Sequence, residues 1–244
     1  MEDFDVRAAV LVGGTRAVVW DTLAHPRQLA GVAALVGPRP VTVVYSHADW
    51  DHAWGTGGLG RVDEVVAHGV AAHRFRTDVP EELARRRTAT PGAWDDVVPV
   101  PPTRTFRTHL TLDLGGVALE LHALPGHTPD CLVGYVPAWG VLLAGDTVET
   151  PLPVVNDGAA VEGWVARLRA WTGVSAVTTV VPSHGRVGGL ELLDETLAYL
   201  DGLARGAPRP AGVLTSFYDE THRRNVAAVR AATAPQARGT PGPD

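Results

Sequence analysis

The chain has 244 residues, of which 45% are hydrophobic and 20% charged, and its formal net charge is −6. This length suits one α/β domain with a large core. The negative charge argues against nucleic acid as the main partner, because phosphate binding needs a basic surface. No apolar stretch is long enough to span a bilayer, and the acidic residues 1–5 do not resemble a signal peptide. We therefore expect a cytoplasmic protein that makes no membrane contact.

The first hundred residues predict strands, one helix and a proline-rich loop. Residues 78–88 are expected to be helical, because Asp78 is a typical capping residue, Pro80 suits a first turn, and charged residues follow. Residues 91–103 are rich in proline, which favours a loop. This loop forms either a wall of an active-site cleft or a plain surface excursion. Short valine-rich runs predict strands at 8–12, 17–20, 41–45 and 62–67.

The remainder of the chain predicts alternating strands and helices. Residues 109–124 indicate a hairpin, because alternating leucines lead into and out of a Gly115-Gly116 turn. Residues 161–172 place their apolar side chains on one helical face. The tail 233–244, rich in proline and glycine, predicts disorder and leaves a single domain over residues 1–232. Further runs predict strands at 132–136, 141–144 and 177–181, and helices at 189–204 and 217–232.

The segment 47–52, with the sequence His-Ala-Asp-Trp-Asp-His, contains four potential metal ligands directly after the apolar run 41–45. Neutral imidazole and carboxylate are the usual ligands of zinc, iron and manganese. A solvated charge run rarely interleaves two histidines and two aspartates with alanine and tryptophan. The segment therefore predicts a metalloenzyme. Its expected ligands are His47, Asp49, Asp51 and His52.

Three isolated residues, His127, Asp146 and His184, repeat the same arrangement later in the chain. Each is the first residue with a metal-binding side chain after an apolar, strand-like run, and each has glycine or proline nearby. A tight turn after a strand fixes a side chain in space and leaves it facing a cleft. Because four segments share this layout, we predict that they meet in one metal site.

The order of these segments resembles the metallo-β-lactamase-fold hydrolase superfamily. The signature of that superfamily is a His-x-His-x-Asp-His loop, followed by an isolated His, an isolated Asp and a final His. The resemblance covers roughly residues 8–190 and includes residues 9–22, which are similar to a first hairpin that ends beside the site, here with Asp21. It implies an αββα sandwich, in which two mixed β-sheets are flanked by helices. The residue pattern alone indicates only a mixed α/β fold.

The resemblance also implies a ligand set, with Asp49 in place of the second histidine of the loop. One metal ion would be bound by His47, Asp49 and His127. The second ion would be bound by Asp51, His52 and His184, and Asp146 would bridge the two ions about 3.5–4 Å apart. The flavodiiron branch of the superfamily carries a glutamate at the position of Asp49, so a carboxylate there is compatible with a ligand. We expect two divalent ions, zinc first, with manganese or iron possible because an added carboxylate favours harder ions.

The function implied by the resemblance is hydrolysis of a small-molecule ester, thioester or lactone by a metal-bound hydroxide. Asp51 and Asp146 are the expected catalytic carboxylates, and Asp51 would orient the nucleophile and protonate the leaving group. Asp21 would support the metal loop by hydrogen bonds. Two alternatives stay open: a di-iron oxidoreductase related to the flavodiiron proteins, and a non-catalytic metal-binding protein of the same fold.

Several other residues have both a functional and a structural interpretation. Cys131 is either a small buried residue or a catalytic thiol, and the first interpretation is favoured because it stands alone at a strand start. His68 either lines the rim of a cleft or is structural. Arg223 and Arg224 either bind an acidic substrate or belong to a solvated helix face, which we favour.

Overall fold

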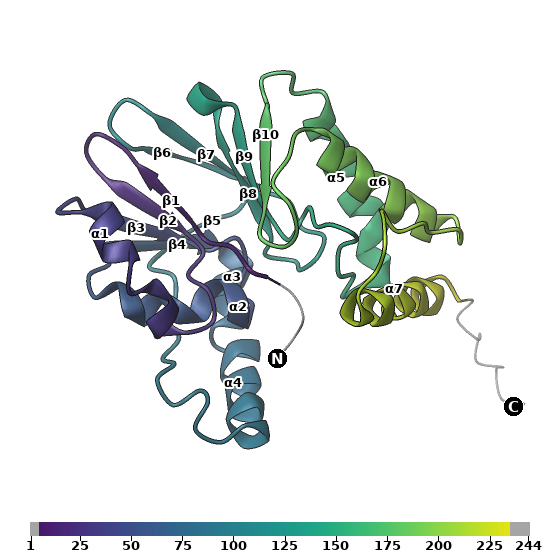
Figure 1. Ribbon diagram of the computed structural model, residues 1–244, viewed down its shortest axis with the longest axis horizontal. Helices are drawn as coiled ribbons and strands as arrows, with labels where there is room; N and C mark the ends of the chain where they lie inside the picture. The colour runs from purple at the N-terminus through teal and green to yellow at the C-terminus, as the bar shows by residue number, and fades with distance from the viewer. Residues whose placement is uncertain (1–4, 235–244) are drawn as a thin grey trace, which may run out of the picture.

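Two five-stranded sheets face each other in the computed structural model, which describes residues 5–234 (Figure 1). The first sheet has the order β1-β2-β3-β4-β5, with β1 antiparallel to β2 and the other neighbours parallel. Its strands are β1 (Ala9–Val12), β2 (Ala17–Trp20), β3 (Val41–Val44), β4 (Glu64–His68) and β5 (Arg104–Phe106). The sheet is therefore mixed, as predicted.

The second sheet has the order β10-β9-β8-β7-β6 and is also mixed. Strands β6 to β9 pair antiparallel, whereas β10 runs parallel to β9. Its strands are β6 (His109–Asp113), β7 (Ala118–Ala123), β8 (Leu132–Val136), β9 (Val141–Gly145) and β10 (Thr179–Pro182). Helices cover the outer faces of both sheets, which confirms the predicted αββα sandwich (Figure 1).

The helices fall into two groups along the chain. Those that pack with the first sheet are α1 (Val32–Val36), α2 (Trp50–Ala53), α3 (Gly69–Arg74) and α4 (Asp78–Ala89). Those that pack with the second sheet are α5 (Val161–Thr172), α6 (Glu191–Ala204) and α7 (Ser216–Thr233). Short 3₁₀ turns lie at Pro26–Leu29, Trp54–Leu59, Pro137–Trp139 and Gly158–Ala160. No helix within residues 5–234 is both long and apolar enough to cross a membrane.

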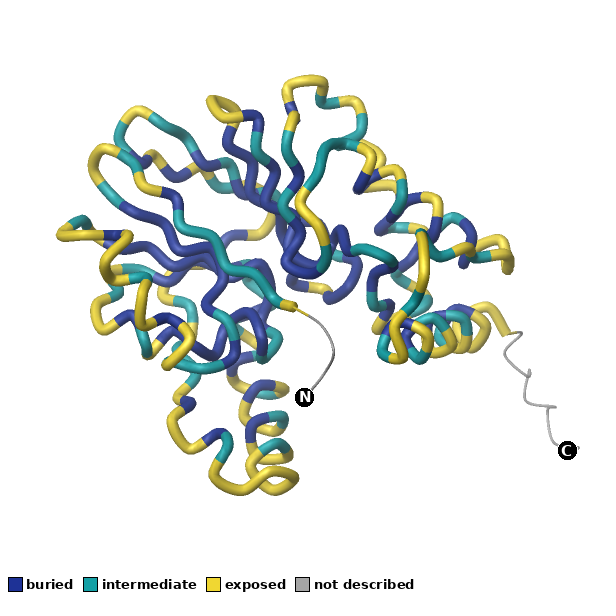
Figure 2. Tube along the Cα trace, viewed as in Figure 1, coloured by how far each residue is buried: buried dark blue, intermediate teal, exposed yellow. Residues whose placement is uncertain are grey.

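The core has three layers, which explains the hydrophobic patterns of the strands. Between the two sheets, Val18 and Trp20 pack with Leu119, Leu121 and other side chains of the second sheet. The two outer layers lie between each sheet and its helices (Figure 2). Strands β2, β3 and β8 are buried along their whole length and read as continuous apolar runs. Strand β7, near the edge, alternates buried and partly exposed residues.

The sequence patterns located the long elements and missed the short ones. The predicted hairpin corresponds to β6 and β7, and the four predicted helices correspond to α4, α5, α6 and α7. The three-residue strand β5 and helices α1, α2 and α3 were not predicted, because none exceeds six residues and so none shows a period. Helix α7 extends to Thr233, the first residue of the predicted tail. The rest of that prediction, residues 235–244, lies outside the described residues.

Candidate metal centre

All seven predicted ligands lie together where the two sheets meet at one edge of the sandwich. The segment 47–52 follows β3, and its second half forms the short helix α2. His127 follows β7, Asp146 comes directly after β9, and His184 comes two residues after β10. Four strand ends from two different sheets thus deliver their side chains to one place.

The carboxylate of Asp146 lies at the centre of the cluster. Its Oδ2 atom is 3.8 Å from Nε2 of His47, 3.4 Å from that of His52, 3.7 Å from that of His127 and 3.4 Å from that of His184. A single oxygen atom therefore faces four imidazole nitrogens from four directions. This is the placement expected of a carboxylate between two cations.

The other two aspartates divide the histidines into two groups. Oδ2 of Asp49 lies 3.5 Å from Nε2 of His47 and 3.4 Å from Nε2 of His127. We call these three residues the pocket-side group, because Asp49 and His127 also line the neighbouring pocket.

The remaining group contains Asp51, His52 and His184. Asp51 places Oδ1 3.6 Å from Nε2 of His52 and Oδ2 3.5 Å from Nε2 of His184. We call it the enclosed group, because none of its three side chains is more than 9% exposed. In each group the ligand atoms lie within 4.8 Å of one another.

Three of the donor atoms in the cluster make no hydrogen bond to the described residues. Nε2 of His47, Nε2 of His52 and Oδ1 of Asp146 are buried and have no hydrogen-bond partner in the described part of the chain. A buried polar atom without a partner costs about 1–3 kcal/mol, and coordination of a cation would remove that cost. Imidazole and carboxylate are also the donor types that zinc, iron and manganese accept. The side chains present therefore fit a pair of divalent ions.

Backbone carbonyl groups orient two of the four imidazoles. Nδ1 of His127 lies 2.9 Å from the carbonyl oxygen of Val154, and Nδ1 of His184 lies 2.8 Å from that of Asp5. A carbonyl oxygen only accepts, so Nδ1 carries the proton in both rings. In the neutral form of each ring, the lone pair of Nε2 is then directed into the cluster.

Asp21 supports the other two imidazoles. Its carboxylate is fully buried and accepts hydrogen bonds from the backbone N–H of Ser46 at 2.7 Å and from the Ser46 hydroxyl at 2.7 Å. It also contacts Nδ1 of His52 at 3.0 Å, while Nδ1 of His47 lies 3.0 Å from the Ser46 hydroxyl. Asp21 adopts φ +58°, a left-handed conformation that aspartate tolerates better than most residues. Its contacts are those expected of a residue that holds the metal loop.

Without cations, the cluster is held by mutual ion pairing. Burial raises the pKa of Asp146, but the charges of His184 and His52 outweigh burial and hold that pKa well below its usual range. Burial lowers the pKa of His127, yet the hydrogen bond to Asp49 and the charge of Asp146 raise it to about 9. Metal ions must displace the protons that these imidazoles hold.

The sequence of the chain also matches a known family. Residues 2–232 fit the family model of the metallo-beta-lactamase superfamily. The chain belongs to this superfamily. The two donor groups lie in one cluster, as the dinuclear metal site of such a protein requires.

Individual relatives of this superfamily member are hydrolases. It is 32% identical over 126 residues to a hydroxyacylglutathione hydrolase from Anaeromyxobacter dehalogenans, and the matched region covers 50% of this chain and 38% of the relative. It is 30% identical over 171 residues to the acyl-coenzyme A thioesterase MBLAC2 of Gallus gallus, and the matched region covers 66% of this chain and 54% of the relative. These matches span only about half of the relatives' length or less. A solved metallo-beta-lactamase from Pontibacter korlensis has 25% identity and a TM-score of 0.61, over 80% of this chain and 87% of that one.

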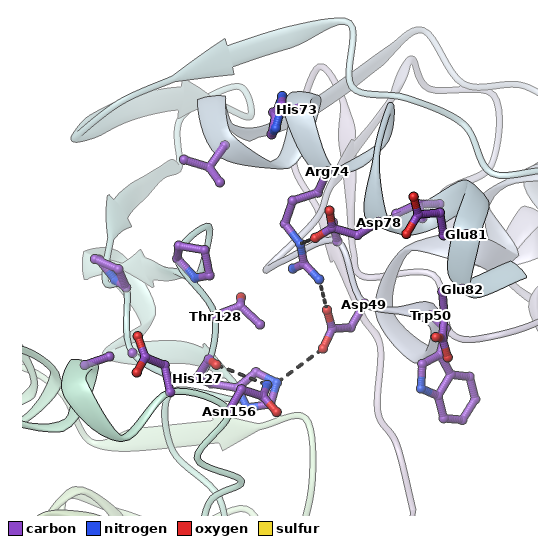
Figure 3. Close-up of a pocket in the computed structure, with 18 of the residues that line it drawn as sticks. Asp49, Trp50, His73, Arg74, Asp78, Glu81, Glu82, His127, Thr128 and Asn156 are labelled. Atoms are coloured by element: carbon purple, nitrogen blue, oxygen red, sulfur yellow. Dashed lines mark hydrogen bonds and ion pairs between the residues drawn. The ribbon is translucent and has the colours of Figure 1, made fainter. Parts of the chain in front are cut away.

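Two residues beside the pocket-side group, Arg74 and Asp130, were not predicted. Arg74 at the end of α3 places one guanidinium nitrogen 2.6 Å from Oδ1 of Asp49 (Figure 3). Another nitrogen lies 2.7 Å from Oδ1 of Asp130. Asp130 is fully buried, and its Oδ2 accepts a hydrogen bond from the backbone N–H of Ala48 at 2.9 Å. The sequence offered one indication of their role, which is that Asp130 lies three residues after the predicted ligand His127.

A second unpredicted pair, Glu149 and Tyr218, connects helix α7 to the site. The Tyr218 hydroxyl donates to Oε1 of Glu149 at 2.9 Å, and the backbone N–H of Val154 contacts Oε2 at 3.3 Å. The carbonyl group of the same Val154 orients His127. Burial raises the pKa of Glu149 to about 7, and the charge of His184 and the hydrogen bond from Tyr218 oppose this only in part.

A pocket of about 1000 Å³ opens beside Asp49 and His127 (Figure 3). One wall comes from α2, α3 and α4 of the first half of the chain, and the facing wall from residues 125–129, 156–163 and Arg167 of the second half. Trp50 forms part of the first wall, and the guanidinium carbon of Arg86 lies 3.9 Å from the centroid of its ring. The walls combine apolar, acidic and basic side chains.

The proline-rich segment 91–103 contributes no residue to the lining of this pocket, so its alternative role as a cleft wall is not supported. It packs against the first sheet's helical layer instead. Its Trp94 ring contacts Trp50 and Trp54 edge to face, with centroids 5.7 Å apart in both cases. The segment therefore lies behind the wall, where it supports the two tryptophans.

The other candidate residues have structural positions. His68 caps α3 by accepting from the backbone N–H of Val70, and it does not line the pocket. Cys131 is buried, which raises the pKa of its thiol well above the usual range. Arg223 and Arg224 lie on an exposed face of α7, where they pair with acidic residues of the same helix. None of the four lies among the ligand atoms.

Proposed function

We propose that this protein is a binuclear metal-dependent hydrolase that cleaves an ester, thioester or lactone of a small molecule. The observation that carries the proposal is the position of Oδ2 of Asp146, between the pocket-side group and the enclosed group and within 3.8 Å of four imidazole nitrogens. Family membership and the hydrolase relatives support the same reaction class.

We propose zinc as the metal, with manganese or iron as the alternatives. His47, Asp49 and His127 would hold one ion, Asp51, His52 and His184 the other, and Asp146 would contact both. Two ions in these positions would supply Lewis acidity, which lowers the pKa of water and polarises a carbonyl group. Four imidazoles favour zinc, whereas the three carboxylates keep harder ions in contention.

Asp51 would transfer the protons of the reaction, and the pocket would bind the substrate. The Asp51 carboxylate faces both His52 and His184, so its orientation is set from two sides. In this position it would orient the attacking water, accept its proton and return a proton to the leaving group. A substrate bound in the pocket beside Asp49 and His127 would have its scissile bond next to the cluster.

A thioester is the first substrate class to test. One relative is named a thioesterase and another a hydrolase of an acylglutathione. A pocket of about 1000 Å³ also has room for more than a small acyl group.

The test is a substrate panel run on metal-free protein and on protein loaded with zinc, manganese or iron. Thioesters, lactones, simple esters and phosphodiesters are offered to wild-type protein and to Asp51→Asn, with metal content measured in the same samples. We expect hydrolysis of at least one carboxylic substrate, dependent on added metal and lost in Asp51→Asn. Hydrolysis that survives complete metal removal would contradict the proposal, as would a fully loaded protein that cleaves nothing in the panel.

The carboxylate of Asp49 supports one alternative, a di-iron oxidoreductase. Asp49 faces His47 and His127 directly, so the pocket-side group has the mixed donors that iron accepts. This activity would require an electron donor in trans. Protein purified from iron-supplemented cells should then show a reversible iron redox signal and consume oxygen with an added reductant. If either the redox signal or the oxygen consumption is missing, the oxidoreductase alternative is wrong.

A further inference from the structure

Arg74 joins the metal-ligand loop to the loop that carries His127. Its guanidinium contacts Asp49 at 2.6 Å, Asp130 at 2.7 Å and Asp78 at 3.0 Å. Asp49 belongs to the segment after β3 of the first sheet, whereas Asp130 belongs to the segment after β7 of the second. Arg74 is only 15% exposed, so these contacts are largely shielded from water. One side chain therefore ties together the two loops that form the pocket-side group.

The contact with Arg74 decides which oxygen of Asp49 is available to a cation. Oδ1 is occupied by the guanidinium, whereas Oδ2 points between His47 and His127. An aspartate without such a partner can rotate, or can present both oxygens to one ion. With Arg74 in place, the carboxylate presents a single oxygen in a fixed direction, as an imidazole does with its Nε2 atom.

Asp130 makes the arrangement rigid. Its Oδ1 accepts from Arg74 and its Oδ2 from the backbone N–H of Ala48, the residue between His47 and Asp49. The loop is therefore held at its backbone by Asp130 and at its side chain by Arg74. An arginine suits this role better than a lysine, because its planar fork directs separate N–H groups at two carboxylates.

We propose that Arg74 is a positioning residue that makes Asp49 a one-oxygen ligand of the pocket-side ion. The proposal rests on the proposed metal centre, but not on any particular substrate. It accounts for an aspartate at a loop position where the superfamily signature has histidine. A histidine at this position would present a single nitrogen atom to the metal ion. It would therefore need no partner residue to occupy a second donor atom, as Arg74 does for the Oδ1 atom of Asp49.

The experiment measures zinc binding without substrate, in wild-type protein, Arg74→Met and Arg74→Lys. Ions retained after dialysis are counted, and the two dissociation constants are obtained by competition with a chromophoric chelator. All variants also carry His122→Ala, because the ligand atoms of His109, Glu120 and His122, of which His109 is exposed, lie within 4.8 Å of one another and could bind added zinc. We expect Arg74→Met to weaken the binding of one of the two ions by about 10–100-fold and to leave the binding of the other unchanged. The zinc affinity of Arg74→Lys should lie between the affinities of the wild type and of Arg74→Met.

A matched pair of variants separates positioning from a general structural role. Asp49→His removes the carboxylate that Arg74 orients. Beside a histidine, the guanidinium has no oxygen to select, and its charge opposes the cation. Arg74→Met should therefore leave zinc binding unchanged or stronger in the Asp49→His protein, although it weakens binding in the wild type. An equal loss in both backgrounds, an equal loss at both ions, or no loss at all would overturn the proposal.

If Arg74→Met does not fold, Asp130→Asn provides the second variant. The amide can still accept from Ala48, but it removes the charge that holds Arg74. Selective weakening of one ion is again expected, and unchanged binding of both ions would count against the proposal. The outcome is independent of catalysis: a protein that binds two ions in this pattern and hydrolyses nothing would refute the proposed function alone.

Discussion

The two donor groups have the same composition, two histidines and one aspartate, but different surroundings. Asp49 of the pocket-side group is 24% exposed and pairs with Arg74, whereas Asp51 of the enclosed group is 9% exposed and faces His52 and His184. Asp21, which is fully buried, contacts His52 of the enclosed group directly, whereas it reaches His47 of the pocket-side group through the Ser46 hydroxyl. The comparison teaches that one group borders the pocket, whereas the other is closed off from it.

The largest effect is expected from the residue that the two groups share. Asp146→Asn removes a carboxylate oxygen that faces all four imidazoles. Both ions should bind more weakly, and kcat/KM should fall on the order of a thousandfold or more. Metal analysis and kinetics on the same samples check this, with circular dichroism to show that the protein is folded. Loss of a single ion would mean that Asp146 belongs to one group only.

A smaller and selective effect is expected from Asp21→Asn. Asparagine tolerates the left-handed conformation of this position, so the change removes the charge and largely spares the backbone. His52 loses its anionic partner, and the enclosed ion should bind about 10–100-fold more weakly. Asp51→Asn serves as the reference, because it removes a donor of the same group. If the pocket-side ion weakened instead, the division into two groups would be wrong.

The residues of the cluster could be found in the sequence because each of their four segments follows an apolar run. His127, Asp146 and His184 need no knowledge of the fold to be found, only the recognition that strand ends gather at one edge. Arg74, Asp130 and Glu149 were not predictable in this way. Their roles depend on contacts across 25 to 82 positions in the chain, and no spacing rule connects residues of those types at such separations.

The pocket could be predicted least of all. Its walls come from helices α3 and α4 and from segments 125–129 and 156–163, which face one another only because the two sheets pack together. The proline-rich segment 91–103 was a reasonable candidate, since loops near strand ends often border active sites. It lies behind the wall because Trp94 is mostly buried and packs against Trp50 and Trp54.

A pH effect should distinguish metal-free from metal-loaded protein. The pKa of His127 is raised from 6.5 to about 9 in the folded, metal-free protein, because its partners Asp49 and Asp146 outweigh burial. The stabilisation from protonated His127 is thus fully present below pH 6.5 and is lost as pH rises through about 9. The loss is on the order of a few kcal/mol. Thermal unfolding should show the metal-free protein losing stability between pH 6.5 and 9, whereas zinc-loaded protein, whose His127 is deprotonated throughout, should not.

The smallest effect is expected at the wall of the pocket. Trp50 lines the pocket beside Asp49, and it supports Arg86 and contacts Trp94 without lying among the ligand atoms. Trp50→Leu removes part of an apolar surface that a substrate would cover, so KM should rise about threefold to tenfold while kcat changes little. Zinc content must stay at the wild-type value, because a lower content would show that the substitution has disturbed the loop. Arg223→Ala is the matched control: Arg223 pairs only with Asp219 and Glu220 among the described residues and lies away from the pocket, so neither KM nor kcat should change. If Arg223→Ala raised KM as much as Trp50→Leu, substrate would bind against α7, and the pocket beside Asp49 and His127 would not be its binding site.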